Sequence, residues 1–239
     1  MKSLAQRLFR SAGYELRRYQ PTSSERAQLM TILNHHGVDL VFDVGANTGG
    51  FGRHLRELGY RGRMVSFEPL KSAHDKLLST TERDKLWSVA MRSAIGAESG
   101  EVELHIAANS ESSSVLEMCD AHSRAAPESH YVGRETVPLR TLDSLAGEYL
   151  GNDTKLFLKI DTQGFEEQVL RGAAKTLSRA FVVQLELSLV ELYADQRLMP
   201  DMVELMKGIG FDLWGMSPVF SDPGSGRVLQ MDGIFSRWS

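Results

Sequence analysis

The sequence predicts an α/β fold in which a doubly wound, mostly parallel sheet carries helices on both faces. Short apolar runs of strand length alternate with segments of helical periodicity. The first run, residues 40–44, enters a glycine-rich turn that leads into a helix. The next run ends in Glu68, roughly 20 residues after Gly45. This order is typical of sheets that bind ligands at the carboxyl ends of their strands.

Composition limits the class of protein. The 239 residues, 42% of them hydrophobic and 24% charged, suit one globular domain with extensions. A net charge of −4 offers no basic surface, so we expect no nucleic acid as partner. Cys119 is the only cysteine, which excludes a disulfide framework and a thiolate zinc cluster. With no apolar run of membrane-spanning length and no signal-peptide core, a cytoplasmic protein is expected.

The first 20 residues differ in charge from the rest of the chain. They hold five cations and one acid, a net charge of +4 that leaves −8 on the remainder. Leu4, Leu8 and Phe9 share a helical face with cations around them, a pattern of helices that lie on anionic membranes. The alternative, which the short apolar face favours, is a solvated helix packed on the domain. Membrane contact through residues 1–20 and a homodimer are left open.

The remaining elements follow in a regular order. We predict a helical extension over residues 1–37, with Ser23 or Ser24 capping its second helix, and a main domain over 38–239. Strands are expected over 40–44, 63–67, 86–96, 101–106, 155–161, 181–187, 213–216 and 228–237, the last two as a hairpin. Helices are expected over 51–55, 70–78, 141–145, 165–177 and 200–209.

Residues 107–134 lose all periodicity and are interpreted as a long loop, a candidate lid over a ligand cleft. His122 and His130 lie in this segment, eight residues apart. That spacing is not specific for a metal site, and we predict both histidines to lie on the surface.

Candidate ligand-binding residues gather around the glycine turn. Asp43 ends the first strand, Gly45 permits a strained backbone or a close ligand, and Asn47 tolerates left-handed geometry. The Glu68 carboxylate, placed at a strand end by Pro69, is suited to accept hydrogen bonds from ribose hydroxyls. NAD and S-adenosylmethionine both fit this pattern. Because Asn47 stands where the NAD fingerprint has its second glycine, the cofactor without a pyrophosphate is favoured.

A second group of charged residues ends two later strands. Lys159 and Asp161 point to the same face of their strand, and Glu186 closes the next strand at the same edge of the sheet. One interpretation is that Lys159 and Asp161 form an ion pair with a purely structural role. Beside a cofactor, however, a carboxylate can orient or deprotonate a substrate hydroxyl, and we favour this functional interpretation.

With these segments placed, the chain resembles the FkbM family of S-adenosylmethionine-dependent methyltransferases. The resemblance covers residues 40–236 in order, and the set of segments is more specific than any one of them. The matching segments are Phe42-Asp43-Val44-Gly45-Ala46-Asn47-x-Gly49, Phe67-Glu68-Pro69, Ala94-Ile95-Gly96 to Gly100, Thr141-Leu142-Asp143, Leu158-Lys159-Ile160-Asp161-x-x-Gly164-Phe165-Glu166, Leu170-x-Gly172-Ala173, Glu186 with Leu192-Tyr193, and Asp232-x-Ile234-Phe235.

The resemblance implies a class I methyltransferase fold, a Rossmann-like seven-stranded sheet whose last strand is antiparallel. It implies that Asp43, Gly45 and Asn47 hold the methionine part of S-adenosylmethionine. Glu68 would then hold the ribose, and Ser93 with Ala94 the adenine. Family members methylate hydroxyl groups of sugars, glycolipids and polyketides, and the parts least like the family, residues 1–39 and 107–134, would choose the acceptor.

These inferences combine into a hypothesis for the reaction. Asp161 is the general base or the group that orients the acceptor, and Lys159 and Glu186 are its electrostatic neighbours. A divalent ion held by Asp161 and Glu186 is an open alternative, since carboxylates at a strand end suit Mg²⁺, but the sequence contains no dedicated ligand cluster and no metal ion is included in the hypothesis. The alternatives are an NAD-dependent oxidoreductase and a non-catalytic cofactor-binding module that docks to a membrane complex through its basic N-terminal helix.

Overall fold

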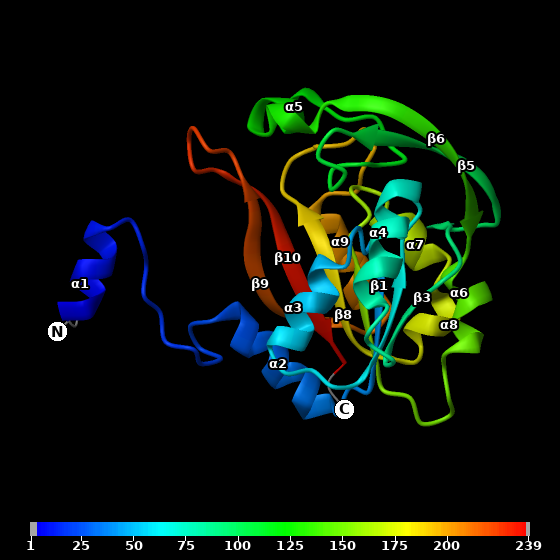
Figure 1. Cartoon of the computed structure of the whole chain (residues 1–239), viewed down its shortest axis with the longest axis horizontal. Helices are drawn as coiled ribbons and strands as arrows, with labels where there is room; N and C mark the ends of the chain where they lie inside the picture. The colour runs from blue at the N-terminus through cyan, green and yellow to red at the C-terminus, as the bar shows by residue number, and fades with distance from the viewer. Residues whose placement is uncertain (1–3, 238–239) are drawn as a thin grey trace.

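A seven-stranded sheet forms the centre of the molecule in the computed structural model, which describes residues 4–237 (Figure 1). Its strands are β1 (Leu40–Val44), β2 (Arg63–Phe67), β3 (Trp87–Val89), β7 (Leu156–Ile160), β8 (Ala180–Ser188), β9 (Asp212–Ser221) and β10 (Val228–Ser236). They lie in the order β3-β2-β1-β7-β8-β10-β9. All neighbours are parallel except those of β10, which runs antiparallel to β8 and β9. The predicted mixed sheet with an antiparallel C-terminal hairpin is confirmed.

The two central strands are buried on both faces. Every residue of β1 and β7 is buried, which fits their nearly continuous apolar sequences. Their parallel register sets Asp43 beside Lys159. The carboxyl ends of β1, β2, β7 and β8 therefore share one edge of the sheet, where open α/β sheets bind ligands.

Helices cover both faces, so the sheet is doubly wound as predicted (Figure 1). They are α3 (Gly50–Glu57), α4 (Lys71–Thr81), α6 (Leu142–Leu145) with the 3-10 turn η2 (Ala146–Glu148), α7 (Glu166–Arg171), α8 (Ala174–Leu177) and α9 (Met199–Gly208). Alternate strand residues face opposite ways. Phe42 packs in the core formed with α6, α7, α8 and α9, whereas Val41 packs in the core that contains residues of α3 and α4.

Two further helices precede the sheet, α1 (Leu4–Ser11) and α2 (Glu25–His36). Ser24 caps α2, because its side chain accepts a hydrogen bond from the Ala27 amide, and Gly37 ends it with a φ of 60°. The apolar face of α2 is buried in the same core as Val41. By contrast, α1 stands away from the sheet (Figure 1), and residues 6–20 are all exposed. The domain boundary after residue 37 stays a prediction.

A second sheet of three strands, in the order β4-β6-β5, lies over the ligand edge. Its strands are β4 (Ala94–Ile95), β5 (Gly100–Ala107) and β6 (Tyr131–Arg140). The single strand predicted over residues 86–96 is therefore wrong, because β3 and β4 belong to different sheets.

The predicted loop over residues 107–134 is only partly a loop. It contains the helix α5 (Asp120–Ala125) and the 3-10 turn η1 (Pro127–Ser129), and β6 begins inside it. The sequence hides β6 because only Val137 and Leu139 of this strand are buried, so its apolar alternation is short.

The long helix predicted over residues 165–177 is also wrong, since the chain breaks it into α7 and α8. A side chain at Gly172 would stand 1.9 Å from the backbone oxygen of Gly96, so the two segments touch through glycine. Asp143 then caps α8 by accepting hydrogen bonds from the amides of Lys175 and Thr176 at 2.9 and 2.7 Å.

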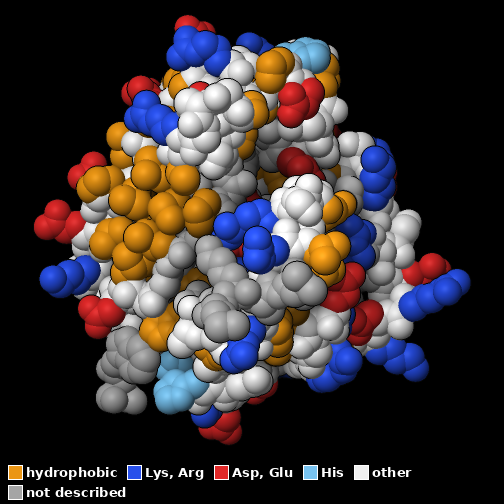
Figure 2. Space-filling model, turned by 90° about the vertical axis from the view of Figure 1, so that its left-hand side faces the viewer, with side chains coloured by type: hydrophobic (Ala, Val, Ile, Leu, Met, Phe, Trp, Pro, Cys, Tyr) orange, Lys and Arg blue, Asp and Glu red, His pale blue; other side chains and the backbone are white. Residues whose placement is uncertain are grey.

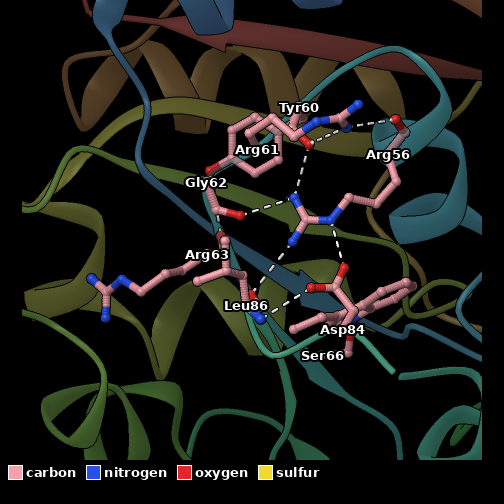
Figure 3. Close-up of polar contacts among 9 residues, drawn as sticks. Arg56, Tyr60, Arg61, Gly62, Arg63, Ser66, Asp84 and Leu86 are labelled. Atoms are coloured by element: carbon pink, nitrogen blue, oxygen red, sulfur yellow. Dashed lines mark hydrogen bonds and ion pairs between the residues drawn. The ribbon is translucent and has the colours of Figure 1, made fainter. Parts of the chain in front are cut away.

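The edge of the sheet opposite the ligand edge is tied together by Arg56 at the end of α3 (Figure 3). Its guanidinium pairs with Asp84 at 2.7 Å and donates to the carbonyls of Tyr60 and Gly62, both at 2.9 Å. These contacts join α3 to the turns before β2 and β3. These contacts fix one end of α3, and the other end of α3 directly follows the glycine turn.

Candidate active site

The glycine turn after β1 has the strained backbone that its sequence predicts. Gly45, Asn47 and Gly49 have φ values of 81°, 46° and 85°. The amides of Gly45 and Ala46 both donate to the carbonyl of Phe67, at 3.0 and 3.1 Å, which holds the turn against the end of β2. A side chain at Gly45 would lie 1.8 Å from the backbone oxygen of Asp161. Gly45 is therefore required by its conformation and by the close approach of the chain after β7.

Glu68 connects the end of β2 to the glycine turn. Its carboxylate accepts hydrogen bonds from the amides of Asn47 and Leu70, at 2.7 and 2.8 Å. Burial raises the pKa of Glu68 to about 7, although both amides oppose this shift. Each carboxylate oxygen has a further acceptor site, so Glu68 can bind ribose hydroxyls without giving up these bonds.

A cavity of about 580 Å³ opens at these strand ends. One part of it is lined by predicted residues that follow the strands β1, β2 and β3, namely Gly45, Asn47, Glu68, Ser93 and Ala94. Asp161, Lys159 and Glu186 line another part. The structure thus brings eight of the nine predicted site residues to one cavity. Asp43 is buried behind them and does not line it.

Lys159 joins β1 to the chain after β7. Its ammonium lies 3.4 Å from Asp43 Oδ1 and 3.1 Å from Asp161 Oδ2, and it stands over the ring of Phe51 at 5.1 Å. Burial opposes the charge of Lys159, but the carboxylates of Asp161 and Asp43 outweigh it and raise the pKa of the ammonium. Burial also raises the pKa of Asp43 against the pull of this cation. The charged lysine keeps Asp161 oriented in the cavity wall.

Gln163, which sequence reasoning missed, holds two of the predicted carboxylates together. Its side-chain amide donates to Asp161 Oδ1 at 2.9 Å and to Glu186 Oε2 at 2.8 Å. Its carbonyl oxygen accepts from the Tyr193 hydroxyl at 2.7 Å, which fixes the orientation of the amide. The backbone of Gln163 has a φ of 55°, so the turn after β7 is strained as well. Such strain in a cavity wall is typical of functional sites.

Two more residues at this edge were not predicted as part of the site. Gln230 on β10 also donates to Glu186 Oε2 at 2.8 Å, and Asp232 stands opposite Glu186 in the pairing of β8 with β10. Burial, followed by the charge of Asp161, raises the pKa of Asp232 to about 7 and that of Glu186 well above its usual range. The only sequence signal for Asp232 was its place in the family-like segment near the C-terminus.

His122 corrects a prediction from the sequence. It is buried and lines the cavity from α5, whereas His130 is exposed as predicted. The ring of His122 packs against Tyr193 and Phe220, with centroids 5.1 and 5.2 Å away. Its Nδ1 has no hydrogen-bond partner in residues 4–237, and burial lowers the pKa of the imidazole. The sequence could not show this burial because the packing partners come from distant segments.

The buried acids predict a pH dependence of stability. Burial is the main cause that raises the pKa values of Glu68, Glu166 and Asp232, each to about 7. A folded-state pKa above the unfolded value means that the folded protein binds more protons, so stability falls as pH rises towards and through 7. We expect the melting temperature of the cofactor-free protein to fall between pH 6 and pH 7.5. Asp232→Asn should make this fall in melting temperature smaller. An unchanged fall would show that Asp232 does not have the raised pKa that causes it.

The residues of the cavity fit an S-adenosyl nucleoside. The buried Glu68 faces the cavity beside a turn that only glycine can form at Gly45, and neighbouring walls at Ser93 and Ala94 are apolar or uncharged. Carboxyl groups outnumber cations in the lining, which suits a sulfonium better than a pyrophosphate. Within the described ranges, no cluster of three His, Cys, Asp or Glu side chains is arranged to hold a metal ion.

A family model described as the methyltransferase FkbM domain matches residues 43–213. The chain belongs to the FkbM family. This FkbM protein is a methyltransferase, its fold is the class I Rossmann-like fold, and its cofactor is S-adenosylmethionine. The family resemblance stated from the sequence is confirmed. No curated protein sequence matches the chain significantly.

Solved structures of similar architecture are distant in sequence. A putative RNA methyltransferase from Pyrococcus horikoshii is 13% identical, with 90% of this chain and 84% of that chain covered and a TM-score of 0.47. A precorrin-6y C5,15-methyltransferase from Geobacter metallireducens is 12% identical over 90% and 87%, also with a TM-score of 0.47. A 1,6-didemethyltoxoflavin-N1-methyltransferase from Burkholderia thailandensis, solved with S-adenosylhomocysteine, is 10% identical over 88% and 76%, with a TM-score of 0.46.

Proposed function

We propose that this FkbM protein transfers the methyl group to a hydroxyl oxygen of a sugar, glycolipid or polyketide-type acceptor. The observation that carries the proposal is the carboxylate of Asp161, which is one-third exposed in the cavity wall and fixed on both oxygens. Bound S-adenosylmethionine supplies an electrophilic methyl group. An alcohol is a weak nucleophile towards it, so the protein must align the hydroxyl and accept its proton.

Asp161 is placed to do both tasks. Lys159 donates a hydrogen bond to Oδ2 and Gln163 donates one to Oδ1, so the plane of the carboxylate is fixed. Each oxygen retains a second acceptor site for the acceptor hydroxyl. A general base contributes about 10²- to 10⁴-fold to a rate.

The charge of the cavity supports an acceptor without phosphate groups. The lining contains two cations, Arg53 and Lys159, and six carboxyl groups, those of Glu68, Glu111, Glu128, Asp161, Glu186 and Asp232. Lys159 is already paired with two carboxylates, which leaves little positive charge for a phosphate. We therefore propose a neutral or cationic hydroxylated acceptor and no nucleic-acid substrate.

The segment 107–134 forms another wall of the cavity in this proposal. Asn109 to Ser113, Val115, His122 and Glu128 line the cavity from this segment, and Asn47 donates from its side chain to Ser110 at 3.2 Å. The segment thus bounds both the cofactor turn and the remaining space. It can select the acceptor by shape and by hydrogen bonds from its polar side chains.

The test is methyl transfer from labelled S-adenosylmethionine to a panel of hydroxylated acceptors. The panel pairs each neutral glycoside or hydroxylated polyketide with its phosphorylated form and includes a structured RNA. We expect label in a base-stable ether of a neutral member. Transfer to RNA, or to a nitrogen or carbon atom, would contradict the proposal.

His122 provides a prediction for this acceptor wall. His122→Ala should raise the KM for the methylated acceptor roughly tenfold, as expected when one hydrogen bond to a bound group is lost, while the affinity for S-adenosylhomocysteine stays unchanged. His130→Ala is the matched control, because His130 is exposed in the same segment and should leave KM unchanged. Equal KM values for the wild type and His122→Ala would show that His122 does not contact the acceptor.

A further inference from the structure

The N-terminal arm, residues 4–20, has two chemically different sides. At 3.6 residues per turn, Leu8 and Phe9 fall on one side of α1 and Arg7 and Arg10 on the other. Leu8 is 65% exposed and Phe9 47% exposed. The solvated helix packed on the domain, favoured from the sequence, is therefore contradicted. A short helix that leaves its apolar side in water needs another surface to cover it.

The chain after α1 continues the same composition. Tyr14, Leu16 and Tyr19 are all exposed, and Arg17 and Arg18 stand between them. Tyrosine is favoured where an apolar phase meets water, because its ring is apolar and its hydroxyl polar. Figure 2 faces the side of the molecule on which α1 lies, and it shows hydrophobic side chains in several places on this side, with lysine and arginine side chains among them.

The charge of the arm indicates which kind of surface would cover it. Residues 1–20 carry +4, and the rest of the chain carries −8. An anionic bilayer would attract the arm and repel the remainder, so the arm alone would touch it. Each lysine or arginine near such a surface strengthens binding roughly fivefold. No helix in residues 4–237 is long and apolar enough to cross a membrane, so any contact made by α1 lies along the surface.

We propose that α1 and the residues up to Tyr19 form a surface anchor for anionic membranes. The apolar side of α1 enters the boundary between head groups and acyl chains, and Arg7 and Arg10 pair with lipid phosphates on the other side. Further along the chain, Tyr14 and Tyr19 lie at the same boundary between head groups and acyl chains. The anchor is independent of the catalytic cavity and holds the methyltransferase domain at the membrane surface.

The test is co-sedimentation of the full chain with vesicles. One set contains phosphatidylcholine alone, and the other contains phosphatidylcholine with a quarter of phosphatidylglycerol. The variants are Leu8→Asp combined with Phe9→Asp, and Arg7→Gln combined with Arg10→Gln. The control is Val132→Asp, because Val132 on β6 is 60% exposed and lies outside the arm. Calorimetry with S-adenosylhomocysteine checks that every variant is folded.

We expect the wild type to bind the anionic vesicles at least about tenfold more tightly than the neutral ones. The Asp pair should abolish this binding, the Gln pair should weaken it, and Val132→Asp should leave it unchanged. Equal binding to both kinds of vesicle, or binding to neither, would overturn the proposal. A dimer that the Asp pair dissociates, without vesicle binding, would show instead that a second copy covers the arm.

Discussion

Gly45→Ala is expected to weaken the binding of S-adenosylhomocysteine at least about a hundredfold and to lower the thermal stability of the protein. The backbone at Gly45 has a φ of 81°, which costs about 1–2 kcal/mol for a residue with a side chain. The new methyl group would also stand 1.8 Å from the backbone oxygen of Asp161. Either the turn or the chain after β7 must move, and both belong to the cavity wall.

The control for this prediction separates the strain of a positive φ from the clash with the backbone of Asp161. Gly59 also has a positive φ, 98°, but a side chain there would meet no atom within 4 Å. Gly59→Ala should therefore cost only about 1–2 kcal/mol of stability and leave S-adenosylhomocysteine binding unchanged. Melting curves and isothermal calorimetry measure both variants. If Gly45→Ala behaved like Gly59→Ala, the close approach of the two chain segments would not matter for binding.

Asp161→Asn is expected to reduce kcat about 10²- to 10⁴-fold while changing the affinity for S-adenosylhomocysteine only a few fold. Asparagine keeps the shape and can still accept a hydrogen bond from Gln163. It cannot take a proton from a hydroxyl, and it removes one of the two anions paired with Lys159. Some loss of stability is therefore expected together with the loss of turnover.

Glu167→Gln is the matched control for lost charge. Glu167 pairs with Arg171 and Arg197 at 2.6 and 2.8 Å, but it does not line the cavity. Its replacement also removes an anion from two ion pairs, so stability should fall while kcat stays at the wild-type value. Full turnover by Asp161→Asn would refute the role of Asp161 as base. A matching loss of kcat in Glu167→Gln would show that destabilisation alone reduces turnover.

The parts of the site that the sequence predicted are those in which local chemistry decides the structure. Asn47 was placed in left-handed geometry because few other residues tolerate it, and the backbone confirms this. Lys159 and Asp161 were placed on one face by strand periodicity, and they are 3.1 Å apart. The central strands were recognisable because both faces of each are buried.

The parts that the sequence did not predict depend on contacts between distant segments. Gln163 is an ordinary turn residue until Glu186 and Tyr193 are brought to it by other strands and loops. His122 lies in a polar segment, yet Phe220 from β9 covers it. The break between α7 and α8 depends on Gly96, far away in the chain. In each case local propensity was overridden by tertiary packing.

The central claim is that the glycine turn and Glu68 form the pocket of an S-adenosyl nucleoside. Isothermal calorimetry of the wild type and of Glu68→Ala, with S-adenosylhomocysteine and with NADH, tests it most directly. Removal of Glu68 deletes the acceptor that we propose for the ribose hydroxyls, and it leaves the amides of Asn47 and Leu70 unpaired. We predict heat with S-adenosylhomocysteine, none with NADH, and a loss of affinity of at least about a hundredfold in Glu68→Ala. Binding of NADH without S-adenosylhomocysteine, or full affinity in Glu68→Ala, would contradict the account.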